Sequence, residues 1–534
     1  MKKIHPFVCA LLTAVMLSIP WLVKETGLLL LFAFVPLLYA EQQIASVNKS
    51  FKIWVIGYLS FLCWNIFTTW WLYCVSEDMY TKLFATLLPI IANALLMSIP
   101  WILFHHTKKR FGNNIGYVSL VCYWLAFEYC HLNWDLSYPW LTLGNGFATS
   151  IHFIQWYEYT GSLGGSVWIL IANIVLFQLC QAHFNNGEKK SKLKLLFASS
   201  FVVIFPIILS LIVFYTYHEK INPVNIVVVQ PNIDPYNEKF DQRYCKQNLQ
   251  KLLDLAASKT DSTTDYFVGP ETALVAGMWE NHIHQDASLK TIREFIKPYP
   301  KLKCVVGAST YRMYDKGKSH SATARKYGSK EDLWYDAYNT ALELDHTDSI
   351  QIYHKSKLVP GSEKMPYPRA LKFLEFLALD LGGIVGTLGV QDEPSVFYSD
   401  NDSMVIAPAI CYESIYGEYV TEYIKKGAQL IFVITNDGWW DNTPGHLQHL
   451  SYSNLRAIET RRCVARSANT GVSCFINQKG EESQTTEWWV ATAIQAKLNA
   501  NKELTFYVKH GDYICLLLSF CALLLLLGLL RSRF

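Results

Sequence analysis

Long apolar runs at both ends of the chain constrain its fold more than any other feature. A helix needs about 20 apolar residues to cross a hydrocarbon core of roughly 30 Å. Runs approaching that length fill the first 217 residues and the last 25 of the 534-residue chain, of which 51% is hydrophobic. We therefore expect an α-helical membrane bundle of about eight spans, near residues 5–23, 27–42, 52–74, 82–105, 114–131, 163–183, 195–217 and 511–530.

Basic residues between the runs predict the orientation of the bundle. With eight spans, five basic clusters all fall on one side, and the alternate loops carry little positive charge. The clusters are Lys2 with Lys3, Lys49 with Lys52, Lys108 to Arg110, Lys189 to Lys194, and Arg531 with Arg533. Both termini are then cytoplasmic, and the domains expected are residues 1–217 (about seven spans), an outward-facing soluble domain at 218–505, and a last span with a basic tail at 506–534.

Charge and cysteine spacing exclude several classes of function. A net charge of +3 does not favour a nucleic-acid partner. The 13 cysteines include no CxxC pair or other metal spacing, and no nucleotide motif is present, so we expect no metal and no cofactor. His446 and His449, three residues apart, are more typical of structural residues than of ligands. Five cysteines lie in the soluble stretch, so one thiol stays free; we expect Cys411, and leave the pairing of the others open.

The soluble stretch alternates between strand-like and helix-like patterns. Short apolar runs predict strands at 225–230, 266–269, 304–307, 340–344, 350–353, 404–410, 430–434 and 472–476. Amphipathic or long patterns predict helices at 242–257 and 446–467. Because strands covered by helices on both sides become continuous apolar runs, this order predicts a layered α/β domain.

Three reactive side chains each stand near the end of a strand-like run. They are Glu271 after Pro270, Lys355 in Tyr-His-Lys, and Cys411 in Ala-Ile-Cys-Tyr-Glu. A cysteine thiol with a pKa of about 8.5 is mostly protonated at neutral pH, so a nearby carboxylate is needed to take its proton. A lysine can stabilise the thiolate and the oxyanion that follows. Singly each residue is a weak signal, and together they predict a thiol-based acyl-transfer site.

Several ordered motifs carry a resemblance to a known family. They are Val229-Gln-Pro-Asn232, Pro270-Glu271-Thr272, Tyr338-Asn-Thr340, Tyr353-His-Lys-Ser-Lys-Leu-Val-Pro360, Ile410-Cys-Tyr-Glu413, Thr435-Asn-Asp-Gly-Trp-Trp440, Arg456-Ala-Ile-Glu-Thr460 and Arg466-Ser-Ala-Asn-Thr-Gly471. In these motifs the chain resembles the nitrilase superfamily and, along nearly its whole length, the bacterial apolipoprotein N-acyltransferases. The resemblance implies an αββα sandwich with a Glu-Lys-Cys triad, inserted before the last membrane span.

The resemblance also implies roles for particular residues. Glu271 would be the general base, Lys355 the oxyanion stabiliser and Cys411 the nucleophile. Glu363, eight residues after Lys355, would be a further essential glutamate, and Glu413 would line the pocket and support Lys355 or the incoming amine. Trp439 and Trp440 would form a lid that touches lipid. The chain departs from the family pattern at Gly361-Ser362, where Phe-Gly is usual before the glutamate.

The implied reaction is an acyl transfer in the bacterial inner membrane, with the soluble domain on the periplasmic side. A phospholipid would donate its acyl chain to Cys411, and a diacylglyceryl-modified apolipoprotein would accept it at its N-terminal amine. Two alternatives stay open: a membrane-tethered amidase acting on a small amide, and a non-enzymatic transporter. The sequence leaves the oligomeric state, the acyl preference and the choice of lipoproteins undetermined.

Overall fold

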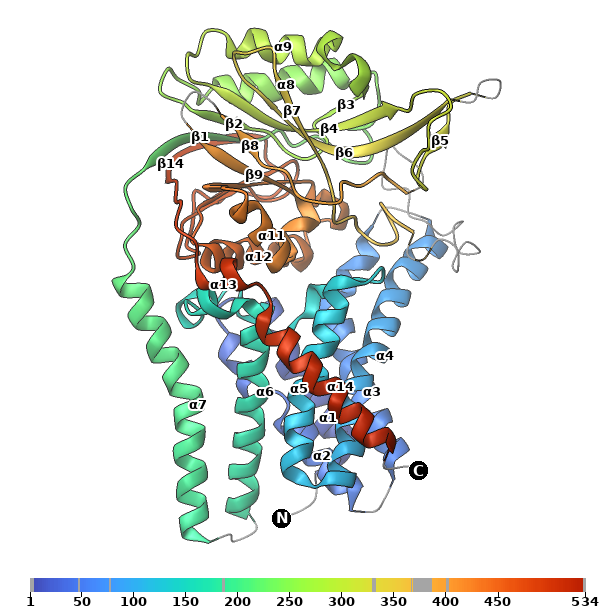
Figure 1. Ribbon diagram of the computed structural model, residues 1–534, viewed down its shortest axis with the longest axis vertical. Helices are drawn as coiled ribbons and strands as arrows, with labels where there is room; N and C mark the ends of the chain where they lie inside the picture. Colours follow the sequence, from blue (N-terminus) through green and yellow to red (C-terminus); the bar gives the residue numbers. More distant parts are fainter. Residues whose placement is uncertain are drawn as a thin grey trace. The chain divides into compact units, whose positions relative to one another are not determined.

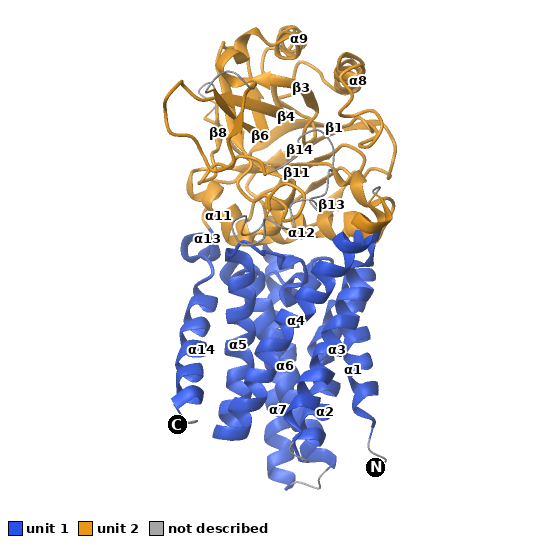
Figure 2. Cartoon of the chain, turned by 90° about the vertical axis from the view of Figure 1, so that its right-hand side faces the viewer, with its two compact units in different colours: residues 1–73, 83–217, 505–534 blue, residues 74–82, 218–504 orange. Residues whose placement is uncertain are grey.

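The structure is a computed structural model that describes residues 4–46, 49–75, 78–184, 188–328, 333–365, 367, 387–399 and 403–531. The chain divides into two compact units, coloured separately in Figure 2. The first unit comprises residues 1–73, 83–217 and 505–534, and the second comprises residues 74–82 and 218–504. Among the basic residues used for orientation, Lys2, Lys3 and Arg533 lie outside the described residues.

The first unit is built from helices. They are α1 (Pro6–Leu22), η1 (Gly27–Phe32), α2 (Val35–Ala45), α3 (Ser50–Thr69), η2 (Trp70–Cys74), α4 (Met79–Phe111), α5 (Asn113–Asn133), η3 (Pro139–Leu141), η4 (Leu143–Phe147), η5 (Ile151–Phe153), α6 (Tyr157–Phe184), α7 (Lys189–Thr216), α13 (Phe506–His510) and α14 (Tyr513–Arg531). A helix lies at each of the eight predicted spans. Six helical segments of the described chain are long and apolar enough to cross a membrane.

The two predicted spans outside those six are α1 and α5. The first has only 17 residues, and the second carries polar residues such as Glu128 and His131. Two buried carboxylates of this unit have polar partners, which reduces the cost of placing them in an apolar setting. Glu41 on α2 contacts His105 and Lys108 on α4, and Glu128 accepts hydrogen bonds from the Trp124 indole and the Leu143 backbone N–H.

The second unit contains two sheets. The first has the strand order β14-β1-β2-β4-β6-β5, with β3 paired to β4 and β7 paired to β6. The second has the order β13-β12-β11-β10-β9-β8. The strands are β1 (Pro223–Gln230), β2 (Tyr266–Val268), β3 (Leu274–Trp279), β4 (Lys303–Met313), β5 (Arg325–Lys326), β6 (Trp334–Leu344), β7 (Ile350–His354), β8 (Phe397–Tyr398), β9 (Val405–Ile410), β10 (Leu430–Thr435), β11 (Val464–Ala468), β12 (Cys474–Ile476), β13 (Glu482–Ser483) and β14 (Thr492–Asn499).

Helices cover the outer faces of both sheets. Helices α8 (Cys245–Ala257) and α9 (Ala287–Ile296) lie over the first sheet, and α11 (Gly417–Lys425) and α12 (Pro444–Thr460) lie over the second (Figure 1). Leu252 and Ile292 from the helices pack with Val227 and Phe267 of the strands in one core. The sheets face each other where the rings of Tyr266 and Phe432 meet at 5.2 Å. The predicted αββα sandwich is confirmed.

The predicted helix over 446–467 is wrong in its last part. Helix α12 ends at Thr460 because Arg461 has a left-handed backbone, with φ of 50°. The following residues form β11, which pairs in parallel with β10 through Phe432 opposite Ala465. Residues Val464–Ala468 are fully buried between neighbouring strands, so tertiary packing decides their conformation.

Candidate active site

The predicted reactive residues follow strands β2, β7 and β9 directly or within three residues. Parallel pairing of β1, β2 and β4, and of β9, β10 and β11, brings the carboxyl ends of these strands to the same edges of their sheets. Glu271 comes three residues after β2, Lys355 directly after β7, and Cys411 directly after β9. The fold therefore gathers three side chains from distant parts of the sequence, with Glu271 and Lys355 alone 84 residues apart.

A close approach between backbones holds Glu271 in place. The N–H of Gly307 on β4 donates to the carbonyl of Pro270 over 3.1 Å. A Cβ on Gly307 would lie only 2.6 Å from Cα of Glu271 and 2.5 Å from the backbone nitrogen of Thr272. Only glycine leaves room for this contact. The backbone of β4 thus fixes where the Glu271 carboxylate projects.

Lys355 lies between two carboxylates. Its Nζ donates to Oε1 of Glu271 over 3.0 Å and to Oε1 of Glu363 over 2.9 Å, and its side chain is 1% exposed. Asn339 on β6 donates its amide to the same two oxygens, over 2.7 Å and 3.0 Å. Burial works against the charged form of Lys355, but the two carboxylates outweigh it and raise its pKa well above the usual value. Lys355 therefore stays cationic.

The same contacts keep Glu271 ionised. Burial acts to raise the pKa of this carboxyl group, but the charges of Lys355 and Lys239 and the bond from Asn339 bring the pKa below its usual value. A carboxylate in this state accepts protons and does not donate them at neutral pH. Glu271 can serve as a general base.

The Gly361-Ser362 departure does not prevent Glu363 from reaching Lys355. Gly361 has φ of +90°, which glycine adopts without strain, and its N–H donates to the Lys364 carbonyl over 2.8 Å. The resulting tight turn directs the side chain of Glu363 inward. Its Oε2 accepts from the Val359 backbone N–H over 2.8 Å, which anchors the other end of the carboxylate.

Cys411 adopts an unusual backbone conformation. Its φ of 51° is left-handed, a conformation that costs a non-glycine residue on the order of 1–3 kcal/mol and concentrates at functional sites. The turn interrupts the strand direction after Ile410 and starts the short helix η8 (Cys411–Ile415). Burial raises the pKa of the Cys411 thiol, Glu271 raises it further, and Lys355 opposes both. The resting thiol is protonated, so a base must remove its proton.

Glu413 is fully buried and organises the backbone around the site. Its carboxylate accepts from the Tyr353 hydroxyl at 2.6 Å, the Ser356 N–H at 2.7 Å and the Ile410 N–H at 2.8 Å. These bonds tie the segment on either side of Lys355 to the end of β9. Glu413 was predicted to line the pocket and to support Lys355 or the incoming amine. Its bonds reach Tyr353 and Ser356, on either side of Lys355, and its role toward an amine stays a prediction.

Trp439 and Trp440 lie in the short helix η9 (Asp437–Trp440) after β10, and both are partly exposed. The Tyr236 hydroxyl donates to the Trp439 carbonyl over 2.7 Å. The Trp439 ring meets the rings of Tyr236 at 5.3 Å and Phe240 at 6.2 Å. The role of this aromatic group as a lid remains a prediction.

Sequence reasoning missed an ionic cluster next to the backbone of Cys411. Asp437 accepts from Arg466 at 2.6 Å and contacts Nδ1 of His449 at 2.8 Å, while Nε2 of His449 lies 3.1 Å from the Cys411 carbonyl oxygen. Burial acts to raise the pKa of Asp437, but Arg466 and His449 hold it well below its usual value. The motifs that contain Asp437 and Arg466 and the residue His449 were each noted in the sequence. Their contact was missed because residues 446–467 were predicted to form one helix, which holds Arg466 away from the strand ends.

Breaking this cluster should destabilise the second unit. An Arg466→Met variant leaves the Asp437 charge buried with fewer partners, which costs about 3–5 kcal/mol. We expect a fall in melting temperature on the order of 10 °C, measured on the full-length protein. Arg243→Met, which removes an exposed arginine from its pair with Asp241, is the matched control and should melt like the wild type. Equal melting of the Arg466 variant would contradict the assigned pairing.

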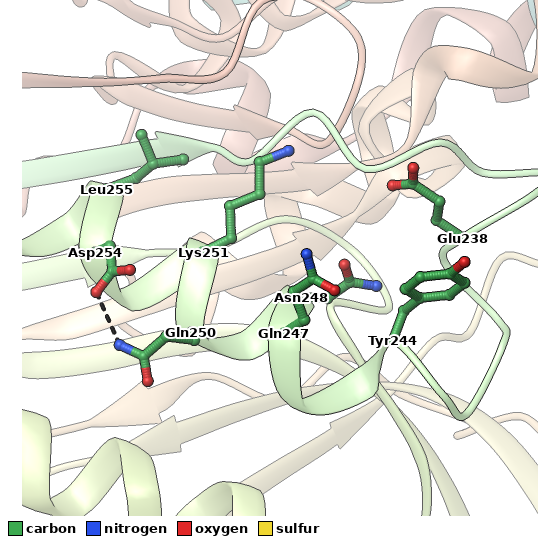
Figure 3. A pocket seen from close by; sticks show the side chains of 8 residues that line it. All are labelled: Glu238, Tyr244, Gln247, Asn248, Gln250, Lys251, Asp254 and Leu255. Carbon is green, nitrogen blue, oxygen red and sulfur yellow. Dashed lines mark hydrogen bonds between the residues drawn. The ribbon is translucent and has the colours of Figure 1, made fainter.

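A pocket of about 590 Å³ lies along α8, away from the triad. It is lined by Glu238, Tyr244, Gln247, Asn248, Gln250, Lys251, Asp254 and Leu255 (Figure 3). Its lining includes no residue of the Glu271, Lys355 and Cys411 group.

Comparison with known proteins agrees with this geometry. Residues 226–503 match the carbon-nitrogen hydrolase family, and residues 13–175 match the apolipoprotein N-acyltransferase N-terminal domain. Since the first match spans more than half of the chain, the protein belongs to the carbon-nitrogen hydrolase family, in the form that carries this N-terminal domain.

Individual relatives resemble the chain over almost its full length. The apolipoprotein N-acyltransferase of Chlorobaculum tepidum is 28% identical, over 99% of this chain and 97% of the relative. That of Geobacter metallireducens is 24% identical, over 95% of this chain and 92% of the relative.

A solved structure resembles about half of the chain. The crystal structure of Saccharomyces cerevisiae Nit3, a member of branch 10 of the nitrilase superfamily, covers 52% of this chain and 90% of its own at 13% identity, with a TM-score of 0.37.

Proposed function

We propose that the protein is an apolipoprotein N-acyltransferase. It takes a fatty acyl chain from a phospholipid onto Cys411 and passes it to the N-terminal amine of a diacylglyceryl-modified lipoprotein. One observation carries the proposal: a chain that contains the apolipoprotein N-acyltransferase N-terminal domain also gathers Glu271, Lys355 and a strained Cys411 in one buried site.

In the first half-reaction, Glu271 accepts the thiol proton of Cys411 as the sulfur attacks the ester carbonyl of the phospholipid. Lys355, held cationic between Glu271 and Glu363, stabilises the oxyanion. The C–O bond to the glycerol breaks, Glu271 returns the proton to the departing oxygen, and a lysophospholipid leaves. The acyl chain remains on Cys411 as a thioester.

In the second half-reaction, the amine of the lipoprotein attacks the thioester carbonyl. Glu271 takes a proton from the attacking nitrogen, the C–S bond breaks, and the proton passes to the Cys411 sulfur. A covalent intermediate divides one difficult transfer into two easier ones. The partly exposed rings of Trp439 and Tyr236 are suited to cover the acyl chain and exclude water, which favours transfer over hydrolysis.

The orientation follows from the charge pattern. We propose that both termini are cytoplasmic and that the catalytic unit lies on the periplasmic side of the bacterial inner membrane. The basic clusters beside alternate spans support this arrangement. Because both substrates are membrane-anchored, the apolar helices let the enzyme meet them without extracting lipid into water.

Intact-mass spectrometry tests the proposal directly. After incubation with phospholipid, the purified protein should gain the mass of one acyl chain, and hydroxylamine should remove it. A diacylglyceryl-cysteine peptide should then discharge the adduct and become N-acylated, whereas the same peptide with a blocked N-terminus should not. Absence of any adduct on the folded protein, together with hydrolysis of a small amide, would instead identify a membrane-tethered amidase.

A further inference from the structure

Lys239 is a second buried lysine close to the reactive group. It lies in the segment between β1 and α8, and it is 2% exposed. Its Nζ donates to the backbone carbonyl of Glu271 over 2.9 Å. The side-chain amide of Asn436 lies 3.3 Å from the same nitrogen. An ammonium group has three donors, so this contact pattern is sparse for a group so deeply buried.

The charges of the triad act on Lys239, and its charge acts on them. Burial lowers the pKa of Lys239 to about 7, while Glu271 and Cys411 favour its protonated form. A lysine in this range gains or loses its proton near neutral pH. Its ionisation therefore depends on whether the two neighbouring acidic groups carry a charge.

Lys239 adds a positive charge beside a group of side chains that is otherwise negative. Glu271, Glu363 and Lys355 together carry one net negative charge, because two carboxylates share one ammonium group. When the proton moves from Cys411 to Glu271, the negative charge moves onto sulfur and the total stays the same. A protonated Lys239 brings that total to zero. In a buried site a neutral group of charges costs much less than an uncompensated one.

We propose that Lys239 is a second cation of the acyl-transfer site, which positions Glu271 through its backbone carbonyl and compensates the negative charge held by the Cys411 thiolate. The inference rests on the proposed function. It assigns to Lys239 a task that Lys355 cannot perform alone, since Lys355 is already engaged by two carboxylates.

Among the described contacts of Lys239, the only titratable partners are Glu271 and Cys411. From the other elements, the titratable groups that act on it are Glu271 after β2 and Cys411 after β9. On its own segment, Phe240 places its ring 5.6 Å from Nζ. The Phe240 ring in turn stacks on Trp439, so the lysine lies beneath the aromatic group described above. Closure of that group over an acyl chain would dry the site and increase the effect of each charge.

The test measures the pH dependence of Cys411 alkylation by iodoacetamide, followed on the Cys411 peptide by mass spectrometry. In Lys239→Met, alkylation below pH 7, where the wild-type Lys239 carries its proton, should slow roughly tenfold. Lys239→Gln keeps a hydrogen-bond donor without the charge and should slow in the same way. Lys239→Arg keeps the charge and should be alkylated at the wild-type rate.

Lys251 supplies a matched control. Its Nζ also donates to a backbone carbonyl, that of Asn232, over 3.0 Å, and it lies on α8, where it lines the pocket (Figure 3). Lys251→Met should leave the alkylation profile unchanged. The proposal is overturned if the Met and Gln variants are alkylated at the wild-type rate below pH 7, or if the Arg variant slows as much as they do.

These outcomes are independent of the proposed function. Alkylation needs neither phospholipid nor lipoprotein, so the Lys239 profile remains measurable even if no acyl adduct forms on Cys411. The Gln variant also covers the case in which Lys239→Met does not fold. A thermal melt of each variant separates a specific change in alkylation rate from a general loss of structure.

Discussion

Replacing Cys411 by alanine should abolish the acyl adduct and reduce turnover by roughly 10⁴-fold or more, the scale seen when a covalent nucleophile is removed. A thioester requires a thiol, and the groups that contact each other beside Cys411 are the carboxylate of Glu271 and the ammonium of Lys355. The measurements are the intact mass after incubation with phospholipid and the initial rate of lipopeptide acylation.

Cys304 provides the control for Cys411. It lies on β4 in the same unit, fully buried in the core beneath α8 and α9. Cys304→Ala should lower stability slightly through lost packing and leave the acyl adduct in place. An adduct that persists in Cys411→Ala, or disappears in Cys304→Ala, would move the nucleophile away from Cys411.

Replacing Lys355 by methionine should reduce turnover on the order of 10²–10³-fold, as the loss of one oxyanion donor does in other acyl-transfer sites. The same change leaves Glu271 and Glu363 next to each other without their shared ammonium group. Burial and repulsion then raise the pKa of Glu271, which Lys355 lowers in the wild type.

The sign of the pH effect follows from that shift. Glu271 acts as a base only when it is ionised, so a higher pKa moves the acid limb of the rate profile toward higher pH. Rates of the Lys355→Met variant should therefore recover in part as the pH rises. Lys426→Met, at an exposed pair with Glu393, should reproduce the wild-type profile. An unshifted acid limb in the Lys355 variant would show that Glu271 is not the titrating base.

Much of the fold could be predicted from local patterns. Continuous apolar runs marked β1, β9 and β10 because their residues are buried on both faces. The hydropathy of the end segments predicted the helices of the first unit for a different reason. The apolar windows of α7 and α14 are only 11% and 17% buried within the structure, and an apolar surface of this kind is what a membrane-spanning helix presents to lipid. By contrast, the sequence pattern extended α12 through Ser467, where the structure has β11, because an Arg-containing run of small residues carries no strong preference of its own.

Residue type and position within strand-ending motifs determined the candidates Glu271, Lys355, Glu363 and Cys411. These motifs indicate the chemistry directly, because a thiol-based acyl transfer needs a thiol, a base and a cation in any fold. Only the tertiary structure decided how these groups are held and charged. Lys239, Asn339 and the Asp437–Arg466 pair join the site through contacts between segments distant in sequence. Their importance arises from burial and distance, which no local pattern of residues encodes.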